Sequence, residues 1–349
     1  MTDEALGAAK PLLTIAIPTY NRAEILKQLL SELAGQLEND PRVELIVCDN
    51  ASPDATQAVV DEYRKSGLAM LYVRNESNLG ADRNILQCFS RAGGKYVLVL
   101  GDDDYILPGG LAKLLQILSG DEEYDLVYLP PRSSWGAKRG SQPRSVCNFR
   151  VATADPVRFS RIVTVTGDLI NISTIVTNKD RVSDVMPESC EDMIGSHVIQ
   201  LAWVFSALGR ARQCLIADDD IVRCGRGRPH GGFNAASVFV VNYVKAMDLW
   251  LGPAQSRLKR SLIDDLMVFW FANWIGMRRH PEMFSTQDSR QLVRALAGHE
   301  ALSGSRLRYW LFVIPLVWLP IHGAAAWNRI LMLLRRRLLA RRVLGAVSS

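Results

Sequence analysis

The sequence has few of the residues that form disulfide frameworks or zinc sites. Its six cysteines include no Cys-x-x-Cys pair, and only five histidines are spread over 349 residues. Several cysteines, such as Cys48 and Cys214, lie inside apolar runs, where a thiol behaves as a small core residue. We therefore expect reduced thiols and a cytoplasmic setting rather than a disulfide framework.

Signals for export, repeats and membrane spans are also missing. Met1–Lys10 carries acidic residues and no apolar centre, so we expect no signal peptide. The apolar stretch Tyr309–Ile321 is 13 residues long and contains two prolines, whereas a spanning helix needs about 20 residues. There is no internal repeat and no low-complexity segment.

Acidic residues are absent after Glu300, where eight arginines follow. Within Ala324–Leu344 an apolar stripe recurs at helical spacing, and most arginines fall outside it; the stripe comprises Trp327, Ile330, Leu331, Leu334 and Leu338. Such a helix suits the surface of an anionic membrane; the alternative is a helix that packs on the rest of the protein. The aromatic run Leu266–Met277 could join either the core or the same membrane face.

The first half of the chain alternates apolar strands with amphipathic helices. We predict strands at 12–17, 43–48, 70–73 and 96–100, and helices at 22–37, 55–64, 82–91 and 111–118. This alternation predicts an α/β fold with a mostly parallel sheet that helices cover on both faces. Further on we predict a loop at 130–150, a strand at 174–177, a helix at 194–208 and a last strand at 214–217. After Phe233 the sequence is helical almost throughout, so we place a domain boundary there.

Polar residues directly follow three of these strands, where α/β sheets bind ligands. They are Thr19–Asn21, Asp49–Ser52 and Gly101–Asp104. Three successive aspartates repel one another and are costly to bury unless a cation joins them. Their hard oxygens suit Mg²⁺ or Mn²⁺ that also holds phosphates. The alternative for Asp102–Asp104 is a solvated acidic turn.

A further segment, Asn78–Asn84, leads into a helix. Its Gly80 permits close approach of the backbone, and Arg83 could pair with a diphosphate or with one of the aspartates. An ordinary helix start with a surface arginine is the alternative. Near the second strand, Ser52 or Asp54 can cap the next helix, which leaves Asp49 free to accept a hydrogen bond from a nucleobase.

Together, these segments resemble the inverting family 2 glycosyltransferases, which have the GT-A fold. The similar motifs are Pro18-Thr-Tyr-Asn21, Asp49-Asn-Ala-Ser-Pro-Asp-Ala-Thr56, Asn78-Leu-Gly-Ala-Asp-Arg-Asn84 and Leu100-Gly-Asp-Asp-Asp104. The last is similar to the abequosyltransferase-like branch, which works on bacterial O-antigen type glycans. The resemblance covers roughly residues 11–230 and implies a GT-A catalytic domain at 1–233 with a helical region at 234–349.

The resemblance also implies roles for individual residues. The nucleotide part of a nucleotide-sugar donor would contact Pro18, Thr19, Asn21, Asp49, Asn50, Ser52, Asn78, Arg83, Asp102 and Asp103. The cation, Mn²⁺ or Mg²⁺, would be held by Asp102, Asp104 and His230. The loop Arg223–Gly232 resembles a segment that closes over the diphosphate, where Arg226 and Arg228 would act; a generic solvated basic loop is the alternative.

The catalytic base is less well defined. Family members commonly have Glu-Asp at a helix start, and Glu191-Asp192 matches this pair, but the usual spacing from the turn at Gly209 falls near His197. Either Asp192 or His197 could be the base, and we favour Asp192. The alternatives are a charge at a helix N-terminus for Glu191 and Asp192, and a structural histidine for His197.

The sequence therefore predicts an inverting, metal-dependent glycosyltransferase. Its acceptor would be a polyprenyl-diphosphate-linked glycan in bacterial surface polysaccharide synthesis, and the protein would lie peripherally on the cytoplasmic face of the inner membrane, without nucleic acid. One alternative is a nucleotidyltransferase, although the turn after the first strand lacks glycine. The other is a non-catalytic, membrane-attached scaffold with the same fold.

Overall fold

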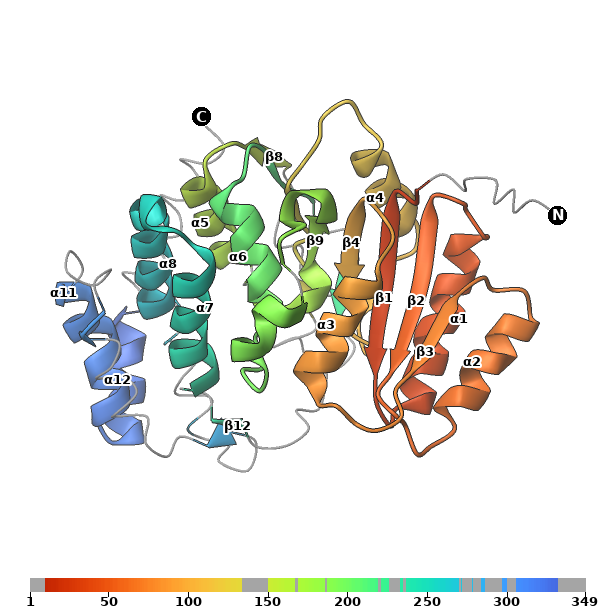
Figure 1. Ribbon diagram of the computed structural model, residues 1–349. Helices are drawn as coiled ribbons and strands as arrows, with labels where there is room; N and C mark the ends of the chain where they lie inside the picture. The colour runs from red at the N-terminus through yellow and green to blue at the C-terminus, as the bar shows by residue number, and fades with distance from the viewer. Residues whose placement is uncertain are drawn as a thin grey trace.

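A large mixed sheet forms the centre of the computed structural model (Figure 1). The structure describes residues 10–133, 150–166, 169–185, 187–218, 221–225, 233–234, 237–269, 271, 278, 284–285, 297–299 and 306–331. The first half follows the predicted alternation: β1 Leu13–Thr19, α1 Ala23–Leu37, β2 Val43–Asp49, α2 Thr56–Lys65, β3 Leu71–Arg74, α3 Ala81–Arg91, β4 Tyr96–Val99 and α4 Gly110–Leu118. Each predicted boundary agrees within two residues.

The sheet has eight strands in the order β3-β2-β1-β4-β9-β6-β10-β8. β1 pairs in parallel with β2 and β4, and β2 with β3. β9 (Ile175–Asn178) lies antiparallel between β4 and β6 (Leu126–Tyr128), while β10 (Cys214–Ile216) is parallel to β6 and antiparallel to β8 (Val151–Thr153). The α/β, mostly parallel fold is confirmed, and β6 and β8 are strands that the sequence pattern did not predict.

Helices cover both faces of the sheet, as the apolar strands require. Alternate residues of β1 point to opposite sides: Ile15 and Ile17 join the core with α1, α2 and α4, whereas Ala16 joins the core with α3. The second core also includes α5 (Pro156–Thr166) and α6 (Leu201–Gly209). The sheet is therefore buried on both sides, and only its edges and strand ends are free to form a site.

The helix predicted at 194–208 begins later than expected. Pro187–Met193 is a 3₁₀ helix, and α6 starts only at Leu201. Gly195 (φ 84°) and His197 (φ 60°) adopt left-handed backbone, which cannot continue a right-handed helix. The prediction was wrong because an apolar periodicity does not show where single residues leave the helical conformation.

The C-terminal region is mainly helical, as predicted. α7 (Tyr243–Trp250) packs against α6, and α8 (Ser256–Val268) against α5. Residues on both sides of position 233 contribute to one continuous apolar cluster; the boundary placed there stays a prediction. No helix in the described parts of the chain has both the length and the apolarity needed to cross a bilayer.

Short strands add two small sheets. β5 (Tyr105–Ile106), β11 (Val222–Cys224) and β7 (Arg132–Ser133) form one, and β12 (Phe233–Asn234) pairs with β13 (Phe284–Ser285) in the other. β7 lies at the start of the predicted 130–150 loop, most of which lies outside the described residues. Most of the aromatic run Leu266–Met277 lies outside them too, although Phe271 is fully buried. The second small sheet begins at the predicted boundary residue Phe233 and was not expected.

Candidate functional site

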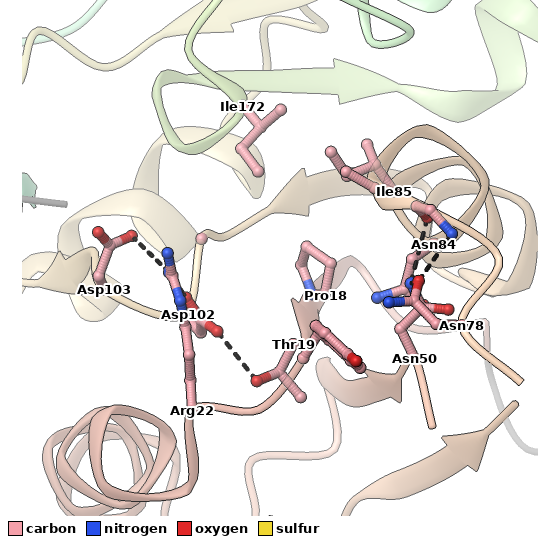
Figure 2. Close-up of a pocket in the computed structure, with 14 residues that line it drawn as sticks. Pro18, Thr19, Arg22, Asn50, Asn78, Asn84, Ile85, Asp102, Asp103 and Ile172 are labelled. Carbon is pink, nitrogen blue, oxygen red and sulfur yellow. Dashed lines mark hydrogen bonds and ion pairs between the residues drawn. The ribbon is translucent and has the colours of Figure 1, made fainter. Parts of the chain in front are cut away.

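A cavity of about 390 Å³ lies at the carboxyl ends of β1, β2 and β4, the edge that the strand-end motifs predicted. We call it the strand-end pocket. Figure 2 shows Thr19, Arg22 and Asp102 on one side of it and the asparagines on the other, with Pro18 between them. Its lining consists of Pro18, Thr19, Tyr20, Arg22, Asn50, Asn78, Gly80, Ala81, Asn84, Ile85, Gly101, Asp102, Asp103 and Ile172.

Asp102 is bound from both sides by the last residue of β1 and by a residue shortly after it. Its Oδ2 accepts a hydrogen bond from Thr19 Oγ1 at 2.9 Å, and its Oδ1 pairs with Arg22 Nη1 at 2.6 Å (Figure 2). Burial raises the pKa of Asp102, and the adjacent Arg22 opposes that rise. Arg22 was not among the predicted site residues; its position directly after the Pro18–Asn21 motif was the available signal.

Asp104 is buried without a basic partner among the described residues. Ser173 donates a hydrogen bond to its Oδ2, and the Gly225 N–H donates to its Oδ1 at 2.8 Å. Burial raises the pKa of Asp104 to about 6, although both hydrogen bonds act in the opposite direction. A buried carboxylate with only neutral donors has an unbalanced charge, which a bound cation would neutralise.

The residues present therefore fit a divalent cation. Asp103, between the other two aspartates in the sequence, lines the strand-end pocket and is partly exposed. Its Oδ1 lies 3.9 Å from Arg22 Nη1. The described residues contain no group of three or more His, Cys, Asp and Glu side chains that could hold a metal by themselves. Mg²⁺ and Mn²⁺ sites with phosphate ligands commonly take only one or two carboxylates from the protein, so two aspartates are enough for such a site.

Gly225 fixes the position of this acidic turn. A Cβ atom added at Gly225 would lie 1.9 Å from the backbone oxygen of Asp103, so no other residue can approach so closely. The strand β11 thereby carries the chain directly past the aspartates. The predicted residues Arg226, Arg228 and His230 come next in sequence, but they lie outside the described residues, and their roles stay predictions.

Asp49 lies beneath the strand-end pocket rather than on its wall. Its side chain is fully buried: Oδ1 accepts the Ser52 N–H at 2.9 Å, and Oδ2 accepts from Tyr72 Oη at 2.6 Å. Ser52 Oγ in turn accepts the N–H of Asn21, whose φ is 54°. These three residues tie the end of β2 to the turn after β1, and their contact with a nucleotide stays a prediction.

Asparagines shape the opposite wall of the strand-end pocket (Figure 2). Asn50 Nδ2 donates to Asn78 Oδ1 at 2.8 Å, and Asn50 Oδ1 accepts from Asn75 and from the Leu79 N–H. Gly80 follows with a φ of 86° and leads into α3. The structure brings Asn50 and Asn78 to the pocket, as predicted, and shows that they also hold the loop before α3.

Arg83 does not reach the aspartates. Its guanidinium forms a bidentate pair with Glu191, with both N–O distances at 2.8 Å. Arg22 occupies the place beside Asp102 that the sequence suggested for Arg83. This pair lowers the pKa of Glu191 and links α3 to the segment Glu191–His197, which we call the 191–197 segment.

The predicted catalytic residues Glu191, Asp192 and His197 share the 191–197 segment but differ in environment. Glu191 is held by Arg83, whereas no partner of the Asp192 carboxylate is found within the described structure. The His197 ring stacks on Phe233 with centroids 5.7 Å apart. All three side chains are exposed, so the structure leaves Asp192 and His197 as the two alternatives.

The residues that form this site lie mostly in a part of the chain that matches known proteins. Residues 14–169 match the family model "Glycosyl transferase family 2". This part of the chain is therefore similar to family 2 glycosyltransferases. It contains the acidic turn and every lining residue of the strand-end pocket except Ile172.

Curated relatives of this chain include two named bacterial transferases. Abequosyltransferase RfbV of Salmonella typhimurium is 38% identical over 126 residues, which are 36% of this chain and 37% of the relative. A GalNAc(5)-diNAcBac-PP-undecaprenol beta-1,3-glucosyltransferase of Campylobacter jejuni is 33% identical over 119 residues, 34% of this chain and 37% of the relative. The matches thus span little more than a third of the length of these relatives.

Solved structures share the fold over a greater length. S. aureus TarS in complex with UDP-GlcNAc has a TM-score of 0.60 and 19% identity, over 93% of this chain and 92% of that one. Mannosyltransferase PcManGT from Pyrobaculum calidifontis, in complex with GDP-Man and Mn²⁺, has a TM-score of 0.53 and 16% identity, over 95% and 88%. The GT-A-like fold of this chain is therefore confirmed.

Proposed function

We propose that the protein transfers a sugar from a nucleotide-sugar donor to a lipid-linked glycan, in a metal-dependent, inverting reaction of bacterial surface polysaccharide synthesis. The observation that carries this proposal is Asp104: a buried carboxylate without a basic partner in the described structure, at the strand ends beside a pocket of 390 Å³. The solved relatives with UDP-GlcNAc, and with GDP-Man and Mn²⁺, support the same class of donor and cofactor.

The residues around the strand-end pocket would divide the work of donor binding. Asp103 and Asp104 would hold Mn²⁺ or Mg²⁺, with Asp102 nearby but already paired with Arg22. The bound cation would supply Lewis-acid stabilisation of the negative charge on the leaving diphosphate. Thr19 and Asn50, on opposite walls, would contact the nucleotide. Asp49 would accept a hydrogen bond from the nucleobase only if its Oδ2, which already accepts from Tyr72 Oη, accepted a second one.

The transfer itself is a single displacement. An acceptor hydroxyl attacks the anomeric carbon, the bond from that carbon to the diphosphate oxygen breaks, and the hydroxyl proton passes to a base on the 191–197 segment. Asp192 suits this role best, because its carboxylate has no partner in the described residues, whereas the Glu191 carboxylate is occupied by Arg83. The nucleoside diphosphate leaves with the electron pair, and the anomeric configuration inverts.

The C-terminal helices support a membrane-side location. Exposed apolar side chains gather there, with Leu307 80%, Trp310 63% and Ile330 57% exposed, beside the exposed Arg306 and Arg329. Leu331 is buried and the Trp327 indole donates to the Leu311 carbonyl, so part of the predicted apolar stripe packs inward. Leu334 and Leu338 lie outside the described residues. We assign contact with anionic lipid to the exposed set around Leu307 and Trp310.

A donor screen tests the function. UDP-glucose, UDP-N-acetylglucosamine, GDP-mannose and other nucleotide sugars are incubated with the protein and Mn²⁺, and release of the nucleoside diphosphate and the rise in melting temperature are measured. We expect one donor to give both signals, with chelation of the metal abolishing turnover. Release of pyrophosphate from a sugar phosphate and a nucleoside triphosphate would instead favour the nucleotidyltransferase alternative, and no binding by any donor would favour the scaffold.

Vesicle binding tests the location. Replacing Leu307 and Trp310 with serine should weaken binding to phosphatidylglycerol vesicles severalfold without lowering the melting temperature, because both side chains are exposed. Leu71→Ser is the matched control, since Leu71 is 46% exposed on the edge strand β3, away from the C-terminal helices. Equal loss in both variants, or none, would contradict the assignment of this surface to lipid.

A further inference from the structure

A buried aspartate at the start of α3 has no role in the site described above. Asp82 is only 4% exposed, and its Oδ2 accepts the backbone N–H of His197 at 2.9 Å. Its Oδ1 is buried without a hydrogen-bond partner in the described structure. Burial raises the pKa of Asp82, while the N–H groups of His197, Gly195 and Ser196 lower it. A side chain that is costly to bury is thus directed at one short stretch of backbone.

That stretch has an unusual conformation. Gly195 and His197 have φ angles of 84° and 60°, on either side of Ser196. Turns with left-handed residues can gather successive N–H groups into a concavity that binds an anion. Glycine adopts this conformation readily, but histidine does so at a cost. The carboxylate of Asp82 stabilises this turn by accepting the N–H of His197.

The same turn of α3 holds the other end of the segment. Arg83 binds Glu191, so two successive side chains of the helix contact residues six positions apart in the 191–197 segment. Asn242 also donates to the Ser196 carbonyl. The next two residues of α3, Asn84 and Ile85, line the strand-end pocket. One helix therefore contacts both the pocket and the segment that carries Asp192 and His197.

We propose that Asp82 is a positioning residue, which holds the backbone of Gly195–His197 so that the base on the 191–197 segment is fixed relative to the strand-end pocket. The proposal rests on the proposed function, because the pocket takes the donor there and the segment supplies the base. Asp82 touches neither substrate; it acts through the backbone of His197.

Two substitutions of similar size separate the hydrogen bond from the charge and the packing. In Asp82→Asn the amide oxygen can still accept the His197 N–H, and its NH₂ group takes the place of the unpartnered Oδ1. Asp82→Leu has a similar volume but no acceptor. We expect Asp82→Leu to increase the exchange rate of backbone amides in a 191–200 peptide by about 10- to 100-fold, since a hydrogen bond to a charged group is lost, and Asp82→Asn to change it less than threefold.

Kinetics then connect the backbone to catalysis. With the best donor of the screen, kcat should fall at least tenfold in Asp82→Leu and less than threefold in Asp82→Asn, while the dissociation constants of UDP and GDP stay within twofold in both. Unchanged exchange in Asp82→Leu, unchanged kcat despite faster exchange, or equally weakened nucleotide binding would each overturn the proposal. Absence of transfer by the unaltered protein would remove the proposed function and the catalytic role together, whereas the exchange measurement would still decide whether Asp82 holds the segment.

Discussion

The proposed donor side of the site, around Asp102 and Asp104, and the proposed acceptor side, the 191–197 segment, are built in different ways. On the donor side, Asp102 and Asp104 are buried and each accepts two hydrogen bonds from residues distant in sequence. On the acceptor side, Asp192 and His197 are exposed, and the contacts of their segment are made largely by its backbone. A site that must hold a highly charged diphosphate needs fixed charges, whereas a base needs an accessible side chain at the end of a fixed backbone.

The strongest test of the donor side is the removal of the Asp104 carboxylate. We expect Asp104→Ala to reduce kcat by about 10³-fold, because the cation that stabilises the leaving diphosphate would lose its buried ligand. The melting temperature without metal should not fall by more than a few degrees, since the variant no longer buries a charge. Turnover is measured against Mn²⁺ concentration, with Asp121→Ala, an exposed aspartate after α4, as the control. Turnover close to that of the unaltered protein would contradict the metal site.

The acceptor side is tested by comparing its two possible bases. We expect Asp192→Asn to lower kcat by about 10²-fold, the lower range for loss of a general base, and His197→Gln to lower it less than fivefold. Both side chains are exposed, so neither change should affect folding. Single-turnover rates separate chemistry from product release. If His197→Gln gives the larger loss, the base is His197, and the preference for Asp192 is wrong.

Two arginines give a direct comparison of the halves. Arg22 pairs with a buried aspartate on the donor side, and Arg83 with an exposed glutamate on the acceptor side. We expect Arg22→Gln to weaken donor binding about tenfold, because the buried Asp102 carboxylate would lose the guanidinium group that neutralises its charge. Arg83→Gln should change kcat and KM less than threefold, as exposed ion pairs contribute little. If the two variants weakened donor binding equally, Arg83 would have to leave Glu191 and bind the donor.

Most of the fold and part of the site follow from local patterns. The strand–helix alternation predicted eight of the first nine elements, all but the two-residue strand β5. The position of Asp102–Asp104 after an apolar run placed them at the sheet edge beside Thr19 and Asn50. The carboxyl ends of parallel strands must meet at one edge, so strand assignment alone was enough to bring these residues together.

The rest depends on contacts between distant residues. The motif before Arg22 signals that this residue is close to the site but not that its partner is Asp102, and nothing near Ser173 shows that it binds Asp104. The antiparallel place of β9 is set by the chain returning between β4 and β6. The helix predicted at 194–208 failed for the same reason. The left-handed turn at His197 is held by Asp82, a residue 115 positions away, and no local pattern records that bond.

The last and smallest expected effect concerns pH on the donor side. In the folded protein the pKa of Asp104 is about 6, against about 3.9 in an unfolded chain. Between these values the folded protein keeps a proton that the unfolded chain releases, so this residue destabilises the metal-free protein progressively as pH rises from about 4 to 6. Asp102 acts in the same direction, since burial also raises its pKa.

The proposed cation would reverse this trend, because it would bind the ionised carboxylate. The rise in melting temperature caused by Mn²⁺ should therefore be small at pH 5, where about a tenth of Asp104 is ionised, and should approach its full value by pH 7. Asp104→Asn should remove the pH dependence of this rise and leave the acceptor side unaltered. If Mn²⁺ raised the melting temperature equally at pH 5 and pH 8, Mn²⁺ binding would not depend on the Asp104 carboxylate. The hydrogen bonds of Asp104 would then be its whole contribution to the donor side.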